Sequence, residues 1–383
     1  MTEAKGRFVG CGCLDDIQQD SCEMKSIMDS DFLIEGDIGD RRDTPESLEM
    51  DQFTAHLDRG WELVARGDYP GAGASVESLQ KLEKNSPDVY TLKGAVLWGQ
   101  GDQETAVEHL KKALELDPDH VDAMIYLAEM LSQEVEYLDE ALGYIQNVRE
   151  LFNGDFPVEV SVLEAEILWN MERHEEFQVV MGKMHENLDV PITVAFRLGW
   201  LLFEAEDYVK AGMWLQRVLD VDNDFADAHY YLGLIDEHFD RHESSLVHFQ
   251  RTRELDLGAQ LEPWSSTAEF FEAQTVRVLS VLSDEYDWLK RERVMTVVLD
   301  IPALELVLEG ADPRMPVYVS TRSSVSPVIM EDEGLKVIVV VYKRNMERMC
   351  RGSDDVEDVL MDVIRKELES LAMALSAQVD SID

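Results

Sequence analysis

A pattern that recurs every 34 residues constrains this chain more than any other feature of its sequence. It is clearest over residues 87–120, where the small residues Gly94 and Ala106 stand at positions that let two antiparallel helices approach closely. Gly101 would turn the chain between the two helices, and Pro118 would end the second one. The unit that repeats is therefore a helical hairpin.

The same pattern recurs at intervals of about 34 residues before and after residues 87–120. The unit starts fall at residues 53, 87, 121, 158, 192 and 226, and the third unit spans 37 residues because it carries an insertion. Each hairpin can bury its apolar side only against its neighbours, which predicts a helical solenoid of six units over residues 53–260. The pattern resembles the tetratricopeptide repeat, and this resemblance implies a right-handed solenoid with a concave binding face.

The resemblance also implies which positions line the concave face of the solenoid. Aromatic and acidic side chains predominate at these positions, and no lysine or arginine falls there. Since Trp and Tyr are frequent hot spots and acidic rims attract basic ligands, we expect a groove that binds a basic or apolar peptide or helix. The candidate groove residues are Trp61, Trp98, Glu129, Glu166, Trp169, Phe196, Trp200, Phe203, Glu204 and Tyr230.

Two other interpretations of the same residues stay open. The aromatic side chains can pack between adjacent first helices, or they can be covered by the N-terminal tail or the C-terminal region of the chain. In the second case the groove is filled in cis, and the repeats have a purely structural role in a larger assembly.

The charge of the chain limits its partners. It holds 34 Lys and Arg against 79 Asp and Glu, for a formal net charge of −45. Nucleic acids and anionic membranes would be repelled, so we expect a protein or peptide partner. No apolar run approaches the roughly 20 residues of a spanning helix. The N-terminus also lacks the apolar region of a signal peptide, so we expect a cytoplasmic location.

The first 50 residues are expected to form a disordered acidic tail. They are rich in Asp and show neither a helical nor a strand period. Cys11, Cys13 and Cys22 lie in this tail. Their spacing is not the paired spacing of a thiolate metal site, which favours incidental cysteines over a metal or redox role.

The 34-residue period does not continue into residues 267–377, which predict a separate α+β domain. An amphipathic stretch over residues 268–289 predicts a helix, and β-branched runs over residues 294–302 and 336–342 predict strands. Apolar residues at helical spacing from residue 356 to about 377 predict a closing helix. The fold class is thus mainly α, a solenoid followed by a small α+β domain.

This domain resembles a bacterial family of minimal zincin-like metallopeptidase domains. The likeness rests on the opening helix, the strand that ends at Asp300-Ile301-Pro302, the segment Val339–Cys350, and the acidic linker before the last helix. In active members that helix holds H-E-x-x-H, whose histidines ligate Zn²⁺ and whose glutamate acts as a general base.

Alignment of the last helix places this motif on Lys366, Glu367 and Ser370. Lysine and serine replace both histidines, and an ammonium group would repel a cation. We therefore expect no metal, no cofactor and no catalytic residue, and a non-enzymatic scaffold with a pseudo-peptidase domain. The former cleft could still bind an extended peptide along an edge strand. The alternative is a metal-dependent peptidase whose repeats recruit the substrate.

Overall fold

The chain divides into two compact units, one ending at Val221 and the other beginning at Asp222. The computed structural model describes residues 45–152, 157–184, 189–286, 289, 293–320 and 335–380. Residues 1–44 lie outside the described residues, so the structure does not test most of the predicted tail. This part of the tail contains Cys11, Cys13 and Cys22. Residues 45–50 belong to a helix, although the tail was predicted to end at residue 50.

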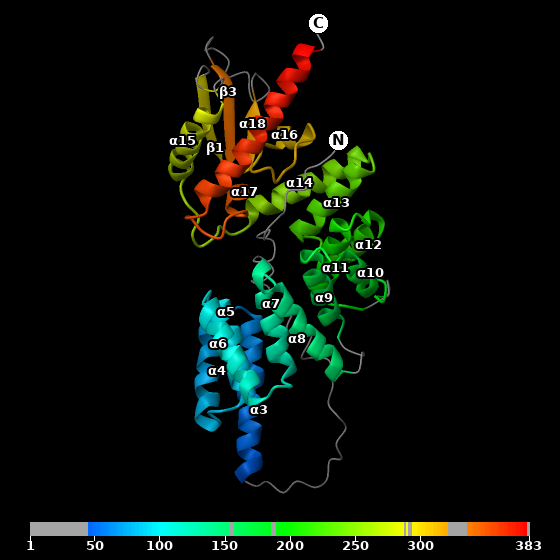
Figure 1. Ribbon diagram of the computed structural model, residues 1–383, viewed down its shortest axis with the longest axis vertical. Helices are drawn as coiled ribbons and strands as arrows, with labels where there is room; N and C mark the ends of the chain where they lie inside the picture. Colours follow the sequence, from blue (N-terminus) through cyan, green and yellow to red (C-terminus); the bar gives the residue numbers. More distant parts are fainter. Residues whose placement is uncertain are drawn as a thin grey trace. The chain divides into compact units, whose positions relative to one another are not determined.

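The unit that ends at Val221 consists of antiparallel helix pairs (Figure 1). The first helices of four pairs begin at residues 87, 121, 158 and 192, where the sequence placed the unit starts. The insertion in the third pair forms a 3₁₀ helix, Val135–Tyr137. The pairs are α3 (Pro45–Ala65) with α4 (Tyr69–Leu82), α5 (Pro87–Gly99) with α6 (Gln103–Leu116), α7 (Val121–Leu131) with α8 (Leu138–Leu151), α9 (Val158–Asn170) with α10 (His174–Met181), and α11 (Ile192–Glu204) with α12 (Tyr208–Val221).

One turn geometry recurs between the two helices of a pair. The residues Gly67, Gly101, Glu172, Glu206 and Asp240 stand at the same position of their units, and all have φ between 57° and 83°. In each turn the N–H of this residue donates to the carbonyl three residues before it, and the next N–H donates to the carbonyl five residues before itself. This is the Schellman pattern that ends a helix. The turn therefore repeats even where glycine is replaced by an acidic residue.

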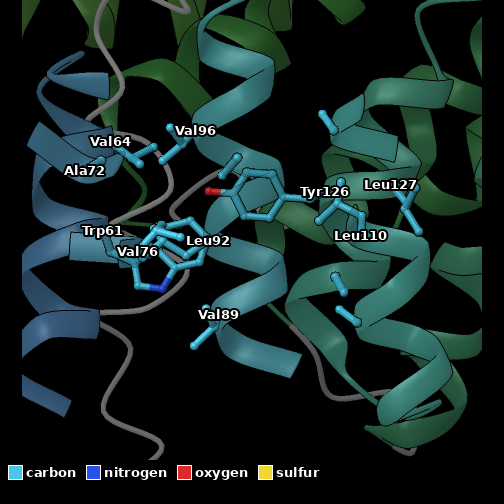
Figure 2. Packing of buried hydrophobic residues seen from close by; sticks show 14 of the residues in the cluster. Trp61, Val64, Ala72, Val76, Val89, Leu92, Val96, Leu110, Tyr126 and Leu127 are labelled. Atoms are coloured by element: carbon cyan, nitrogen blue, oxygen red, sulfur yellow. The ribbon is translucent and has the colours of Figure 1, made fainter. Parts of the chain in front are cut away.

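Small residues in the pairs permit the close helix contact that the sequence predicted. A Cβ atom added to Gly94 would lie 2.7 Å from Leu110 Cγ and 3.3 Å from the Ala106 carbonyl oxygen. Ala106 is fully buried. Figure 2 shows the apolar core around this contact, to which α3, α4, α5, α6 and α7 all contribute side chains.

The unit that begins at Asp222 combines one more helix pair with a three-stranded sheet. In the sheet, β1 pairs in parallel with β3, and β2 pairs antiparallel with the other side of β3. The strands predicted over residues 294–302 and 336–342 correspond to β1 and β3; β2 and the two short helices were not predicted. The elements are α13 (Ala226–His238), α14 (His242–Gly258), α15 (Ala268–Glu285), β1 (Arg293–Leu299), α16 (Leu304–Leu308), β2 (Val317–Ser320), β3 (Leu335–Tyr342), α17 (Lys343–Glu347) and α18 (Val356–Asp380).

Alternation along β3 directs its side chains into two apolar clusters. Val339 and Val341 pack with residues of α15 and α18 on one face, among them Phe271 and Leu360. On the opposite face, Ile338, Val340 and Tyr342 pack with Leu306 of α16 and with Val297 and Tyr318 of the neighbouring strands.. Since both faces are covered, β3 is a buried central strand. Among the described residues, no helix is both long and apolar enough to cross a bilayer.

Candidate binding surfaces on the first helices

The predicted groove residues nearest the N-terminus belong largely to the core. Trp61 is only 8% exposed, and its ring stacks on Tyr126 with centroids 5.3 Å apart and an interplanar angle of 22°. Figure 2 shows both side chains among the buried residues of the cluster. Trp98 meets Tyr126 edge-on at 6.3 Å and stays half-buried. The assignment of Trp61 to a binding groove is therefore wrong, because its ring packs inside the core on Tyr126 of α7, the first helix of the third pair.

A buried ion cluster removes two further residues from the predicted rim. Arg197 of α11 donates through Nε to Glu166 Oε1 at 2.7 Å, and its Nη2 donates to the other oxygen of the same carboxylate. Its Nη1 lies 3.6 Å from Glu129 Oε1. All three residues lie within the unit that ends at Val221. Glu166 and Glu129 therefore share a cation of the chain itself, which corrects the expectation that they set the charge preference for a ligand.

The sequence analysis did not identify Arg197 as a partner of these carboxylates. It occupies the sixth position of its unit, and the resemblance does not place that position on the concave face. Burial raises the pKa of the Glu129 carboxyl, while Arg197 acts to lower it and Glu166 to raise it. The cluster thus holds one guanidinium between the buried Glu166 carboxylate and the Glu129 carboxylate, whose side chain is 24% exposed. The contribution of such a cluster to stability depends on the presence of all three members.

The remaining candidates on α9 and α11, which are the first helices of the fourth and fifth pairs, divide into buried and accessible residues. Phe196 is 3% exposed and belongs to the core, which corrects its assignment to the groove. Trp169 is half-buried and contacts Phe177 and His174, with ring centroids at 5.1 Å and 4.9 Å respectively. Its outer surface stays accessible.

The end of α11 carries the most accessible group of predicted groove residues. Trp200 and Phe203 are half-buried, and Glu204 beside them is exposed. Burial raises the pKa of the Glu204 carboxyl, while the Trp200 side chain acts to lower it. Phe203 packs edge-to-face on Tyr208 at 5.4 Å. We call Trp200, Phe203 and Glu204 the α11 surface; it joins aromatic area with a carboxylate at the protein surface.

Tyr230 of α13 is covered in cis by the C-terminal part of its own unit. Its hydroxyl donates to Asp312 Oδ2 at 3.1 Å, and the Arg314 guanidinium lies 4.7 Å from the centroid of its ring. Arg314 also contacts Asp227 Oδ1 at 2.5 Å and binds both oxygens of Asp256 at 2.9 Å and 3.0 Å. Tyr230 is therefore not part of an open groove, because an arginine of the chain occupies its face.

Asp256 is the carboxylate on which this network converges. It is 3% exposed, and besides Arg314 it binds Arg348 Nη2 at 2.7 Å. Burial acts to raise the pKa of Asp256, but the two guanidinium groups hold it below its usual value. The network explains why α13 and α14 form one compact unit with the sheet, whereas the sequence grouped them with the other repeats.

The segment that suggested the metallopeptidase resemblance has structural roles of its own. The Arg344 guanidinium donates to the carbonyls of Asp256, Leu257 and Ala259, which end α14. Asn345 Nδ2 donates to the carbonyls of Pro313 and Met315. Side chains of this turn therefore join the sheet to the helix pair.

A histidine pair joins α13 and α14. The Nδ1 atoms of His229 and His248 lie 2.9 Å apart, and His229 Nε2 lies 3.0 Å from the Asn223 carbonyl. A carbonyl only accepts, so His229 carries its proton on Nε2 and His248 donates through Nδ1. Burial lowers the pKa of both imidazoles. The pair therefore links α13 to α14 through a hydrogen bond between the two rings.

The three positions aligned with the zinc motif lie on α18. Lys366 and Ser370 are exposed, and Glu367 is half-buried with a pKa raised by burial. Within the described ranges, no three His, Cys, Asp or Glu side chains are grouped closely enough to hold a metal ion. The identity of this domain and its lack of activity stay predictions.

Comparison with known proteins supports the repeats. Residues 87–130 match a family model described as the tetratricopeptide repeat. No curated protein matches the chain. Together with the recurring hairpins, the family match supports a tetratricopeptide-repeat protein.

Three solved structures are similar to about half of the chain at low identity. PilF of Pseudomonas aeruginosa is 15% identical with a TM-score of 0.45, over 55% of this chain and 95% of that one. A tetratricopeptide repeat protein of Parabacteroides merdae is 13% identical with a TM-score of 0.42, over 53% and 78%. A thermophilic repeat protein of Thermus thermophilus is 15% identical with a TM-score of 0.41, over 51% and 99%.

Proposed function

We propose that this chain is a non-catalytic protein-interaction scaffold that binds a basic and apolar peptide or helix at the α11 surface. The observation that carries the proposal is that Trp200, Phe203 and Glu204 together keep accessible surface at the end of one helix. By contrast, Trp61, Glu166 and Phe196 are buried, and Arg314 covers the ring of Tyr230. Aromatic side chains supply contact area and bind cations on their faces, and a neighbouring carboxylate adds charge recognition.

The charges within the chain support the choice of a basic ligand. Arg197 and Arg314 each sit between two carboxylates, and Arg314 in addition lies over an aromatic ring. The first helices thus already hold guanidinium groups in cis by the chemistry that a partner's Arg or Lys would use. A formal net charge of −45 further favours the approach of a basic partner and disfavours nucleic acids and anionic membranes.

Removal of the Trp200 indole is expected to abolish most of the peptide affinity. The measurement is the fluorescence anisotropy of labelled basic, apolar peptides from a library, titrated with the full chain. For peptides that bind at micromolar concentrations, Trp200→Ala should weaken binding about 30-fold, since a central aromatic hot spot contributes about 2 kcal/mol. Glu204→Gln should weaken it less and should reduce the preference for Lys and Arg in the peptide.

Met213→Ala serves as the matched control, because Met213 is an exposed apolar residue on the second helix of the same pair. It should leave the affinity unchanged. If no basic peptide binds the wild-type chain, or if both alanine variants bind equally well, the α11 surface is not the binding site.

We propose in addition that the C-terminal domain is not a peptidase. The support is chemical: an amine and a hydroxyl at residues 366 and 370 replace two imidazoles, and the last histidine of the chain is His248. After dialysis of the full chain against zinc, elemental analysis should find far less than one tightly bound metal per chain, and Glu367→Gln should not change this value. About one tightly held zinc per chain, together with peptide hydrolysis that Glu367→Gln abolishes, would favour the metal-dependent peptidase instead.

A further inference from the structure

Three neighbouring first helices end along one edge of the helical hairpins. Arg197 of α11 binds Glu166 of α9 and also reaches Glu129 of α7, so these three helices lie side by side. Consecutive helices alternate in direction, so α7, α9 and α11 run the same way and the turns that follow them lie on the same side. We call the residues of these three turns, 132–140, 169–176 and 203–210, the turn edge.

Aromatic side chains pack across the turn in the fourth and fifth pairs. Trp169, near the end of α9, packs on His174 at the start of α10, with ring centroids 4.9 Å apart. Phe203, near the end of α11, packs on Tyr208 at the start of α12, with ring centroids 5.4 Å apart. His174 is exposed, and the other three side chains are half-buried. Each of these turns therefore presents two rings with accessible surface.

The turn of the third pair is built differently, and it too exposes apolar and aromatic area. The insertion that lengthens this pair forms the 3₁₀ helix Val135–Tyr137. The side chain of Val135 is 71% exposed and that of Tyr137 is 42% exposed. Because this turn lies on the same side as the other two, these residues continue the row of accessible apolar surface along the turn edge.

The turn edge is strongly acidic. Its three segments hold ten acidic residues against two basic ones. Both basic residues pair with a nearby carboxylate: Arg173 lies 2.7 Å from Glu176, and Lys210 lies 3.0 Å from Asp207. The surface that a partner would meet is therefore complementary to a basic ligand.

Two of these acidic residues stand in a backbone conformation that favours glycine. Glu172 has a φ of 57° and Glu206 a φ of 62°, and both side chains are exposed. In the first two pairs, Gly67 and Gly101 form the same turn without a side chain. Glycine adopts this conformation more readily than glutamate does. The turn itself therefore does not require a carboxylate, which favours a role of the two glutamates in binding.

We infer that the turn edge binds one continuous basic and apolar segment of a partner protein, which crosses the third, fourth and fifth pairs. The inference rests on the proposed function, since the α11 surface shares Phe203 and Glu204 with the turn edge. Packed helices lie about 8–10 Å apart, so the three turns span about 20 Å. An extended segment of about six residues or a helix of about 13 residues covers this distance. The rings contact its apolar side chains and its Lys or Arg, and the carboxylates bind its charges.

The test uses a basic, apolar peptide of about 18 residues that binds the wild-type full chain, because this length crosses three pairs in either conformation. Fluorescence anisotropy measures its Kd. Tyr137→Ala should raise the Kd about tenfold, since it removes an aromatic contact of the interface. Glu172→Gly should raise the Kd about threefold, as expected for one exposed charge pair. Thermal unfolding should show no loss of stability in Glu172→Gly, because glycine suits the φ of 57°.

Leu116→Ala and Glu108→Gln are the controls. Leu116 is 40% exposed at the end of α6, and Glu108 is exposed on the same helix, so both lie outside the turn edge. Neither change should alter the Kd. If Trp200→Ala weakens binding whereas Tyr137→Ala and Glu172→Gly do not, the α11 surface binds the peptide alone and the inference is wrong. If no peptide binds the wild-type chain, or if Trp200→Ala has no effect, the proposed function fails and this inference fails with it.

Discussion

Replacement of Arg197 by methionine is expected to destabilise the unit that ends at Val221 by about 3–5 kcal/mol, because it leaves the buried Glu166 carboxylate without its cation. Glu166 is 8% exposed, and the guanidinium binds both of its oxygens. Methionine keeps most of the side-chain volume, so the loss reports the charge and not a cavity. Urea unfolding followed by far-UV circular dichroism measures the effect.

Arg66→Met is the matched control for Arg197→Met. Arg66 pairs with Glu62 on the surface, where the two side chains are 67% and 42% exposed. Exposed pairs of this kind contribute less than about 1 kcal/mol. If both variants lose the same small amount of stability, Arg197 does not bind buried carboxylates in the manner described.

The loss in Arg197→Met should also depend on pH with a definite sign. Burial raises the pKa of Glu129 in the wild-type chain, and removal of Arg197 removes an interaction that lowers it. A carboxyl whose folded pKa exceeds its unfolded value of about 4.3 takes up its proton on folding. The variant should therefore recover stability as the pH falls toward this value and lose it as the pH rises. An equal loss at every pH would contradict the assignment.

Replacement of Arg314 by methionine is expected to loosen α13 and α14 from the sheet and to reduce the stability of their unit by about 3–5 kcal/mol. The change leaves Asp227 without its ion pair and Asp256 with Arg348 alone. Hydrogen exchange read by mass spectrometry should show faster exchange in α13 and α14 than in α15 and α18. Arg365→Met is the control, because Arg365 pairs with Glu285 at the surface.

Asp256 makes a defined contribution to the pH dependence of the stability of the wild-type chain. Its folded pKa lies below its unfolded value, so its ion pairs contribute stability that is fully present above about pH 3.9 and is lost as the pH falls through the folded pKa. In Arg314→Met this contribution should shrink, and the acid side of the stability profile should become flatter. Unchanged exchange in α13 and α14, with a profile like that of the wild type, would show that Arg314 does not connect the helix pair to the sheet.

The helical hairpins could be predicted from the sequence because their causes are local. Small residues such as Gly94 and Ala106 and the turn at Gly101 lie within one unit, and the same spacing recurs along the chain. The turns at Glu172, Glu206 and Asp240 were harder to recognise, since an acidic residue takes the place of glycine there. Their spacing, and not their residue type, identifies them.

Much of the candidate site could not be predicted, because exposure and ion pairing depend on residues far apart in the chain. Trp61 fits a groove position equally well whether its ring faces solvent or stacks on Tyr126. Glu166 becomes an internal partner only because Arg197 of a later helix reaches it. The strand order β1-β3-β2 likewise depends on pairing between distant segments, which the runs of β-branched residues did not reveal.

The sequence by itself determined where the second to sixth hairpins begin, how the hairpins repeat and how acidic the protein is, since periodicity and composition need no knowledge of distant contacts. Only the tertiary structure decided which aromatic residues stay accessible and that the sixth hairpin packs with the sheet. The physical reason is the same for both. Burial and charge pairing are properties of neighbours in space, and Arg314 lies 84 positions after Tyr230 in the sequence although its guanidinium covers that ring.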